Sequence, residues 1–428
     1  MFFSPKDVIK FVEENDVKFI RLTFSDILGN LKNISIMPNG LAKAFENGVS
    51  FDGVVLDGKH ADLLLFPDAS TLSVLPWRPK TGRVVRFFCY IKKPDGSDYK
   101  GDAREGLYLE LKKIRELGYN CRISTECEFY LFDTDENGEP TKKPHDYAGY
   151  LDVAPLDKCE NVRREICLMF DEMGFKPQSS RHKYGCGQNE IDFRSSEVLT
   201  AADNMVHFKS VVKTVAAQNG LYASFMPKPL NDNYGSGMHI SMFIEKDGKS
   251  IFSYDNGDMN DEGRWFLAGV LNRLKEITCF LNSTTNSYKR FGMGLAPKYI
   301  NYSHDERSSC IRIPYASCDN ARIEIRSADS ACNPYIVFKL LLKAGFEGIE
   351  QKMNLNNSLL GQSYDKFEKL PESLEEAYRL AKESEFVRSS IHEDLLKIIF
   401  NYYEDVLEKY NLAEDKDAFE EEIYFRYV

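Results

Sequence analysis

Arg122-Ile-Ser-Thr-Glu-Cys-Glu-Phe-Tyr-Leu-Phe132 is the stretch that decides the fold of this 428-residue chain. Its β-branched and aromatic residues, followed by the turn-forming segment 133–138, predict a β-strand. Side chains two residues apart on a strand point to the same face, so Glu126 and Glu128 stand side by side. Two carboxylates this close raise each other's pKa unless a cation lies between or beside them.

An exposed Glu-x-Glu pair can simply be solvated, and for an isolated pair that interpretation is the simpler one. Here the flanking Cys127, Phe129 and Leu131 have the apolar character of buried residues, and more candidate ligands follow downstream. The pair therefore favours a site for a divalent metal ion.

Composition and charge exclude several classes of protein. The net charge of −11 argues against a nucleic-acid binder that relies on a basic surface. No apolar stretch approaches the length of a membrane span, and the N-terminus does not have the pattern of a signal peptide. The ten cysteines show no repeated Cys-x-x-Cys spacing, which is typical of reduced, packed thiols. We therefore expect a cytoplasmic protein with no nucleic-acid or membrane partner.

The hydrophobic pattern divides the chain into two domains, 1–100 and 101–428, joined by a polar, glycine-containing linker at 93–102. In the first domain we predict helices at 5–15 and 40–47 and strands at 18–24, 32–37 and 83–91. In the second we predict helices at 103–117, 161–173, 201–219 and 263–281, with a helical tail from about 370. Further strands are predicted at 188–193, 222–226, 237–244, 310–313 and 321–326. This order favours an α+β fold with antiparallel strands and helices on one side of the sheet.

Three other strands carry candidate ligands. His239 follows a glycine turn, Glu324 lies between Arg322 and Arg326, and Glu190 lies in Gln188–Phe193. A single buried histidine is more often a satisfied core residue than a ligand. Charges are rarely buried unless they are paired or coordinate a metal, and carboxylates with an imidazole suit Mg²⁺ or Mn²⁺.

Arginines cluster in the same half of the chain, at Arg290, Arg307 and Arg312. Each could be an ordinary surface charge. Beside carboxylate-bearing strands, however, guanidinium groups are suited to bind phosphate and carboxylate groups. A metal site with arginines indicates phosphoryl transfer, and the absence of a Gly-x-x-x-x-Gly-Lys-Ser/Thr loop disfavours a P-loop enzyme.

At these residues the chain resembles the glutamine synthetase family, bacterial type I, over nearly its whole length. The motifs that carry the resemblance are Phe51–Gly53, Asp62–Asp68, Gly187–Asp192, Phe225–Pro229, Gly235–His239, Asn286–Arg290, Arg307-Ser308, Ile311–Pro314, Arg322–Arg326 and Asn333–Tyr335. The resemblance implies an N-terminal β-grasp domain and a C-terminal catalytic domain of the glutamine synthetase/guanido kinase type, with a curved antiparallel sheet. It also implies a homo-oligomer of two stacked rings, a dodecamer, with active sites between neighbouring subunits. The tail 420–428 is similar to the family's terminal helix, which reaches across to the other ring.

The resemblance implies ATP and Mg²⁺ (or Mn²⁺) as cofactors and assigns the metal ligands. Glu126, His239 and Glu324 match the ligands of the metal that binds the ATP phosphates. Glu128 and Glu190 match two of the three carboxylates that hold the other metal, which binds the substrate glutamate.

The resemblance also assigns the substrate-binding residues. Arg290 and Arg326 match residues that bind glutamate. Arg307 and Arg312 match residues on the nucleotide and the transferred phosphate, with Arg307 in a catalytic role. Ser241 is assigned to nucleotide binding, although it replaces a histidine that the family usually has there.

For the ammonium pocket, the resemblance assigns Asp52, which takes the ammonium proton, and Tyr150. Other positions depart from the family pattern. Lys183 stands where the third metal-ligand glutamate is usual, and the segment 291–297 is shorter than the family's flap and carries no acid. We hypothesise that the ammonium group of Lys183 partly replaces the second metal ion. In the alternative, Lys183 turns outward and a water molecule completes the shell.

Three functions remain open at this stage. The first is an ATP-dependent glutamine synthetase, in which ammonia attacks a γ-glutamyl phosphate. The second is a γ-glutamyl ligase that uses another amine or a related acid. The third is a catalytically silent oligomer with a structural or regulatory role. We favour an ATP-dependent carboxylate–amine ligase, with the use of ammonia in doubt.

Overall fold

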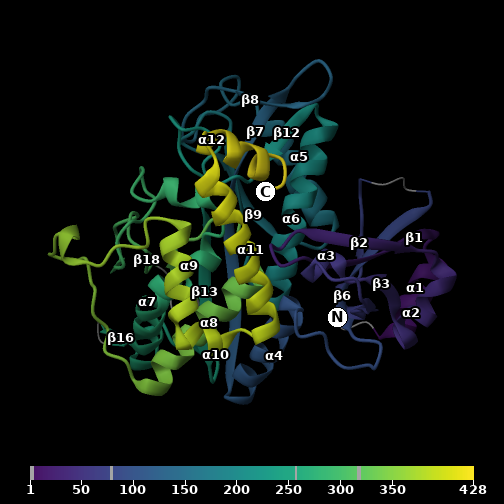
Figure 1. Cartoon of the computed structure of the whole chain (residues 1–428), viewed down its shortest axis with the longest axis horizontal. Coiled ribbons are helices and arrows are strands. Elements are labelled where there is room, and N and C mark those ends of the chain that lie inside the picture. Colours follow the sequence, from purple (N-terminus) through teal and green to yellow (C-terminus); the bar gives the residue numbers. More distant parts are fainter. Residues whose placement is uncertain (1–3, 78–80, 256–257, 316–319) are drawn as a thin grey trace.

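The long strand β7 (Tyr119–Thr134) is the centre of the larger of two sheets, and it contains the whole stretch predicted as a strand. The structure is a computed structural model that describes residues 4–77, 81–255, 258–315 and 320–428. Figure 1 shows the N-terminal domain at one side of the molecule and the larger domain, built on β7, at the other.

The N-terminal domain is a β-grasp unit. Its sheet has the order β2-β1-β6-β4-β3, with β5 paired to β6, and β1 runs parallel to β6 while β2 is antiparallel to β1. The strands are β1 (Val17–Ser25), β2 (Leu31–Ile36), β3 (Val49–Asp52), β4 (Asp62–Pro67), β5 (Ser73–Val74) and β6 (Arg83–Lys92). The helices are α1 (Pro5–Glu14), α2 (Leu41–Asn47) and the short α3 (Val54–Asp57). Ser4 caps α1 in a capping box with Asp7, as expected for a serine followed by proline at the first helical position.

The second sheet has the order β17-β18-β19-β13-β7-β10-β9. It is antiparallel throughout its described pairs except for β17 and β18, which run parallel. The strands of its central path besides β7 are β9 (Pro177–His182), β10 (Gln188–Phe193), β13 (Met238–Lys246), β17 (Tyr302–Ser303), β18 (Ile311–Arg312) and β19 (Ile323–Ile325). Short strands extend it at β8 (Pro140–Pro144), β11 (Ser196–Glu197), β12 (Leu221–Ser224) and β14 (Lys249–Ser250), and β15 (Tyr254–Asp255) pairs separately with β16 (Asp258–Met259).

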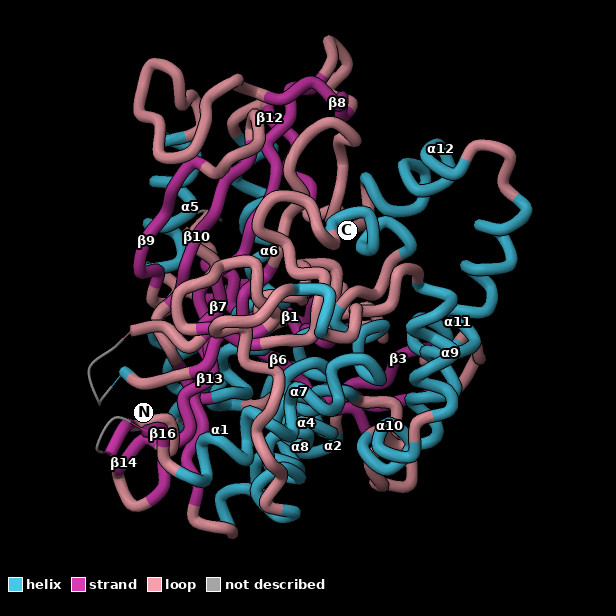
Figure 2. The backbone as a smooth tube through the Cα atoms, turned by 90° about the vertical axis from the view of Figure 1, so that its left-hand side faces the viewer, coloured by secondary structure: helices cyan, strands magenta, loops and turns pink. Residues whose placement is uncertain are grey.

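Helices cover one face of this sheet, and Figure 2 shows α5 and α6 behind β9 and β10. They are α4 (Ala103–Glu116), α5 (Glu160–Glu172), α6 (Val198–Gln218), α7 (Asp261–Leu281) and α8 (Pro334–Gln351). The tail forms α9 (Leu374–Glu383), α10 (Glu385–Ser390), α11 (Glu393–Leu412) and α12 (Lys416–Glu420). Among the described residues, no helix combines the length and the apolar character that a membrane span requires.

The alternation along β7 separates the core from a polar face. Ile123, Cys127 and Phe129 are fully buried in the main hydrophobic core beneath the helices. Glu126 and Glu128 alternate with them and therefore project to the opposite face. The predicted placement of the two carboxylates on one face is confirmed.

Helix α8 was not among the predicted elements, although it lies at the centre of the core. It packs directly on α7, where a Cβ added at Gly269 would meet Ala344 O at 2.1 Å. One added at Gly348 would meet Trp265 O at the same distance. Only glycine permits so close an approach of two helix backbones.

The C-terminal tail contacts the larger domain of its own chain. Tyr424 and Phe425 are buried against Phe132 and Met226. The amide of Phe225 donates to the Val428 carbonyl at 3.2 Å. The apolar patch beside β7 and β12 accounts for this arrangement, because it buries both aromatic rings of the tail.

Nine of the ten cysteines lie among the described residues, and all nine carry free thiols. Burial raises the pKa of Cys310 and Cys332 to about 12, so these two thiols are packed and unreactive.

Candidate active site

Strand pairing gathers the predicted metal ligands on the polar face of the sheet. Glu128 of β7 lies opposite Glu190 of β10, and Glu126 lies opposite His239 of β13. Glu324 lies on β19, which pairs with the other edge of β13. Residues that are up to 198 positions apart in sequence therefore meet because four strands are neighbours in one sheet.

Glu126, His239 and Glu324 form a first group, which we name the carboxylate–histidine cluster. His239 Nδ1 lies 3.2 Å from Glu126 Oε2 and 3.5 Å from Glu324 Oε1. One ligand atom from each residue lies within 4.8 Å of the others. Because carboxylate oxygens and an imidazole nitrogen suit Mg²⁺ or Mn²⁺, the residues present fit a divalent cation.

Glu126 is held in its ionised form. Burial raises the pKa of its carboxyl group, but the hydrogen bond and the charge of His239 outweigh burial and bring this pKa down to about 2. A carboxylate that is ionised at neutral pH and only partly exposed is suited to bind a metal ion.

Two predicted arginines contact the third member of the cluster. Arg312 Nη1 lies 3.2 Å from Glu324 Oε2, and Arg326 Nη1 pairs with Glu324 Oε1. The other predicted substrate arginine, Arg290, is buried with its Nη1 3.3 Å from the Ser327 carbonyl. Guanidinium groups therefore lie directly beside the metal-ligand candidates, an arrangement suited to anionic groups bound to a metal.

Lys183 points into the site and lies between the two buried carboxylates of a second group. Its Nζ is 2.9 Å from Glu128 Oε1 and 2.8 Å from Glu190 Oε2. Burial lowers the pKa of Lys183, but the charges of Glu128 and Glu190 outweigh burial and hold this pKa well above its ordinary value. The side chain is therefore an ammonium group, and the alternative in which Lys183 turns outward is wrong.

The structure adds Asp192 and Arg181 to this face, neither of which was predicted. Arg181 Nη1 lies 3.1 Å from Glu190 Oε1, and Arg181 Nη2 pairs with Asp192 Oδ2. Burial and the neighbouring charge of Glu190 raise the pKa of Asp192 to about 7. Asp192 follows Glu190 by two positions on one strand, so the alternation that pointed to Glu126 and Glu128 would also have found Asp192.

A cavity of about 60 Å³ lies next to the carboxylate–histidine cluster. Charged and polar side chains line its floor, namely Glu128, Lys183, Gln188, His239, Arg290 and Arg326. Its remaining wall is aromatic or apolar and consists of Tyr184, Tyr234, Met293, Leu295 and Ala296 with two glycines. Tyr184 stacks on Tyr150, with ring centroids 4.3 Å apart, so the predicted Tyr150 lies behind this wall.

Three predicted residues lie outside these contacts. Ser241 is buried on β13 opposite Glu324. Arg307 is exposed, and its backbone carbonyl accepts a hydrogen bond from Arg326 Nε at 2.6 Å. Asp52 is on β3 of the N-terminal domain, where its carboxylate lies 2.7 Å from His60 Nδ1. Within one chain, Asp52 is therefore not brought to the carboxylate face among the described contacts.

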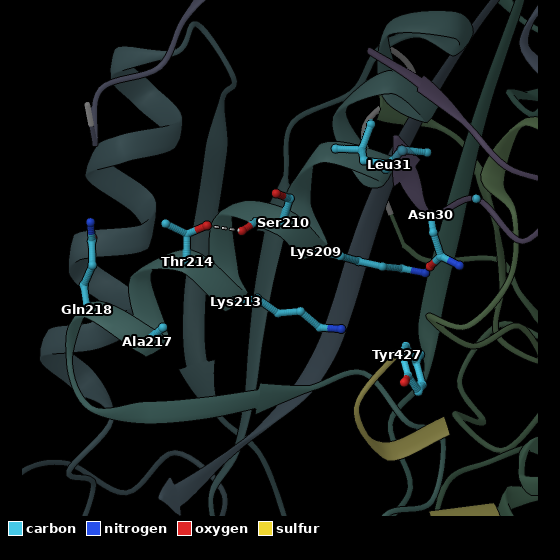
Figure 3. Close-up of a pocket in the computed structure, with 11 residues that line it drawn as sticks. Asn30, Leu31, Lys209, Ser210, Lys213, Thr214, Ala217, Gln218 and Tyr427 are labelled. Atoms are coloured by element: carbon cyan, nitrogen blue, oxygen red, sulfur yellow. Dashed lines mark hydrogen bonds between the residues drawn. The ribbon is translucent and has the colours of Figure 1, made fainter. Parts of the chain in front are cut away.

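A larger pocket of about 690 Å³ lies elsewhere, between α6 and the turn that joins β1 and β2. Figure 3 shows Lys209 and Lys213 extending from α6 toward Asn30 and Tyr427. No acidic side chain within the described residues forms an ion pair with either lysine. Burial and the charge of Lys209 lower the pKa of Lys213 to about 8. This pocket holds none of the predicted site residues.

Comparisons with known proteins match both parts of the chain to one family. The family model described as the catalytic domain of glutamine synthetase matches residues 100–422, and the model of its β-grasp domain matches residues 16–94. The glutamine synthetase of Methanosarcina mazei is 42% identical over 417 residues, which cover 94% of this chain and 92% of that one. The glutamine synthetase of Clostridium saccharobutylicum is 41% identical over 406 residues, which cover 91% of each chain.

Solved structures agree with these matches. A complex of GmaS with ADP has a TM-score of 0.87 and 26% sequence identity, and the match covers 97% of this chain and 98% of that one. GmaS without ligand has a TM-score of 0.86 and 27% identity, over 96% of this chain and 99% of that one.

Proposed function

The chain belongs to the glutamine synthetase family of ATP-dependent carbon–nitrogen ligases, and from this premise we propose that it joins the γ-carboxylate of glutamate, or of a related acid, to an amine. One observation carries the proposal. The cavity that Arg290, Arg326 and Lys183 line lies beside the carboxylate–histidine cluster. Cationic groups on both sides of a transferred phosphoryl group are what phosphoryl transfer to a carboxylate requires.

The proposed reaction has two steps. The substrate carboxylate oxygen attacks the γ-phosphorus of ATP, a carbon–oxygen–phosphorus linkage forms, and ADP leaves. The amine nitrogen then attacks the acyl carbon, phosphate leaves, and the amine loses a proton. A divalent cation at the carboxylate–histidine cluster would supply charge neutralisation at the ATP phosphates.

Each proposed residue has a role in these steps. Arg326 and Arg290 orient the acid substrate. Arg312 on β18, Arg307 and Ser241 on β13 would lie on the side of the nucleotide and the transferred phosphate. The solved complex of GmaS with ADP, which has the same fold, supports a nucleotide site on this scaffold.

The lining of the cavity favours an amine larger than ammonia as the second substrate. Met293, Leu295 and Ala296 contribute apolar surface where an acid would be needed to bind a small cation. Tyr184 and Tyr234 continue this surface, with ring centroids 5.3 Å apart. Alkyl groups of a primary amine would be buried there, whereas ammonia would gain nothing from such contacts.

The discriminating experiment measures ADP release from ATP with glutamate and a panel of amines, ammonia included. We expect turnover that depends on both the acid and the amine, with a higher kcat/KM for an alkylamine than for ammonia. Turnover with ammonia as the only effective amine would instead support the ordinary glutamine synthetase reaction. Nucleotide binding without turnover for any pair of acid and amine would contradict the proposal and favour a silent oligomer.

We further propose a cytoplasmic homo-oligomer of stacked rings, a dodecamer, in which Asp52 and Tyr150 serve the amine pocket. Asp52 is 49% exposed on β3, which belongs to the other sheet and lies away from β9 of its own chain (Figure 1), so a neighbouring subunit would have to supply it. Light scattering coupled to size-exclusion chromatography tests the assembly, because a chain that stays monomeric would leave the site without this residue.

A further inference from the structure

Glu128 and Glu190 are both buried and face each other across β7 and β10. Two buried carboxylates need a cation to offset the cost of removing their charges from water. We infer that the ammonium group of Lys183 is the resident cation of this pair and replaces the second divalent ion that the family resemblance implies. This inference deepens the proposed function and rests on it for the role of the site.

The backbone fixes Lys183 in this position. It directly follows β9, and its amide donates to the Gln188 carbonyl at 2.8 Å, which continues the pairing of β9 with β10. The side chain then reaches inward, where only 12% of it is exposed. Nζ lies 6.0 Å from the ring centroid of Tyr150, so an aromatic ring shields the ammonium group on its outer side.

Each of the four carboxylate oxygens of the pair has a cationic or amide neighbour, although Glu190 Oε1 accepts no hydrogen bond. Lys183 Nζ forms ion pairs with Glu128 Oε1 at 2.9 Å and with Glu190 Oε2 at 2.8 Å. The amide of Gly237 donates to Glu128 Oε2 at 2.6 Å, and Arg181 Nη1 lies 3.1 Å from Glu190 Oε1. A divalent ion would have to displace these groups and would then lie beside two cations. Between Glu128 and Glu190, the residues present therefore do not fit a second metal ion.

Replacing one glutamate and the divalent ion by a lysine also preserves the net charge of the site. Three carboxylates around a divalent ion carry one net negative charge, and two carboxylates around an ammonium group carry the same. Replacing one glutamate by lysine therefore removes both a ligand and the need for the metal. In the carboxylate–histidine cluster, Arg312 and Arg326 pair with Glu324, but no cationic side chain lies between its members, and Glu126 is 31% exposed, so a divalent ion has access to that cluster.

The inference is tested by counting the Mn²⁺ ions bound per full-length chain. Electron paramagnetic resonance measures the free Mn²⁺, and the bound amount is the difference from the total. We expect one tightly bound Mn²⁺ per wild-type chain and two per chain of Lys183→Glu, which restores a third carboxylate. Lys158→Glu is the matched control, since it makes the same charge change at an exposed lysine and should leave the count at one. Two ions of similar affinity in the wild type, or one ion in Lys183→Glu, would overturn the inference.

A second variant covers the case in which Lys183→Glu does not fold. Lys183→Met keeps the length of the side chain but leaves both carboxylates without their cation, so its Tm should fall. Adding Mn²⁺ should then raise the Tm of Lys183→Met by more than it raises that of the wild type, because the ion can replace the lost ammonium group. Equal shifts would contradict the inference. Neither readout requires turnover, so failure of the proposed reaction is distinguishable from failure of this inference.

Discussion

At the scale of single residues, Glu126 shows how one neighbour decides the state of a carboxylate. Burial alone would favour the neutral acid, but His239 Nδ1 at 3.2 Å reverses the effect and brings the pKa of Glu126 to about 2. The carboxylate is therefore ionised over the whole physiological range of pH and available to a cation.

Glu126→Gln should weaken Mn²⁺ binding at the carboxylate–histidine cluster at least tenfold, about 1.4 kcal/mol. The amide keeps the shape of the side chain but removes its charge, so the loss of Mn²⁺ affinity measures the electrostatic contribution of Glu126 and not a change in packing. Isothermal titration calorimetry measures the Kd. Glu116→Gln, at an exposed position on α4, is the control and should leave the Kd unchanged. An unchanged Kd in Glu126→Gln itself would remove Glu126 from the ligand set.

Residue patterns predicted part of this site and missed part of it. Period-two spacing on β7 placed Glu126 and Glu128 correctly on one face. The same spacing on β10 carries Asp192, which was overlooked although the signal was present. Arg181 could not be found in this way, because its role depends on β9 lying next to β10, and no local pattern in 177–182 reports that pairing.

At the scale of elements, α6 carries two half-buried lysines that line a pocket. Lys209 and Lys213 leave the same helix one turn apart and enter one pocket (Figure 3). Burial is the main reason that the pKa of Lys213 falls from 10.5 to about 8, and repulsion from Lys209 adds to it. The charged form of Lys213 therefore opposes folding at neutral pH.

Lys213→Met should stabilise the protein at pH 7 by on the order of 1 kcal/mol, a rise in Tm of about 1–2 °C. Between pH 8 and 10.5 the unfolded wild type binds more protons than the folded wild type. The free energy of unfolding of the wild type therefore rises toward that of the variant as the pH rises. The difference in Tm should therefore shrink from pH 7 to pH 9.5. Thermal unfolding at both pH values checks this, with the exposed Lys112→Met as the control. A variant that is less stable than the wild type at pH 7 would show that Lys213 has a stabilising partner.

Long, periodic elements were predicted best. Helices α4, α5, α6 and α7 lie within three residues of their predicted bounds, because each alternates apolar and polar positions with helical spacing. Helix α8 was missed although its contrast between apolar and polar faces is similar to that of α7. Strands β18 and β19 are shorter than predicted, because the paired stretch is limited by their neighbours and not by their own sequence.

At the scale of the whole molecule, the two domains divide the proposed machinery unequally. The carboxylate face belongs to the larger sheet, whereas Asp52 belongs to the β-grasp domain. We propose that the boundary lies near residue 100 and that the β-grasp domain of one copy completes the site of the next. Heterologous contacts of this kind close into rings.

Co-expression of two inactive variants tests this arrangement. Asp52→Asn and Arg326→Ala should each be inactive alone, because they damage the two halves of one shared site. Mixed at random in one ring, they should recover about one quarter of wild-type turnover, since that share of sites receives both halves intact. Turnover is measured on the co-purified oligomer, with each single variant as the control. No recovery would mean that Asp52 does not act in a neighbouring site, and full activity of Asp52→Asn alone would remove its catalytic role.

The sequence by itself determined the family, the two-domain α+β plan and the identity of the metal-ligand candidates. It could do so because the periodicity of strands is local and the motifs carry several specific residues each. The tertiary structure alone decided that Lys183 turns inward and pairs with both Glu128 and Glu190. It also decided that Arg181 joins them and that Tyr424 and Phe425 pack against Phe132 and Met226. These outcomes depend on which strands are neighbours and on which charges are buried together, and such long-range pairings leave no mark on the local pattern of residues.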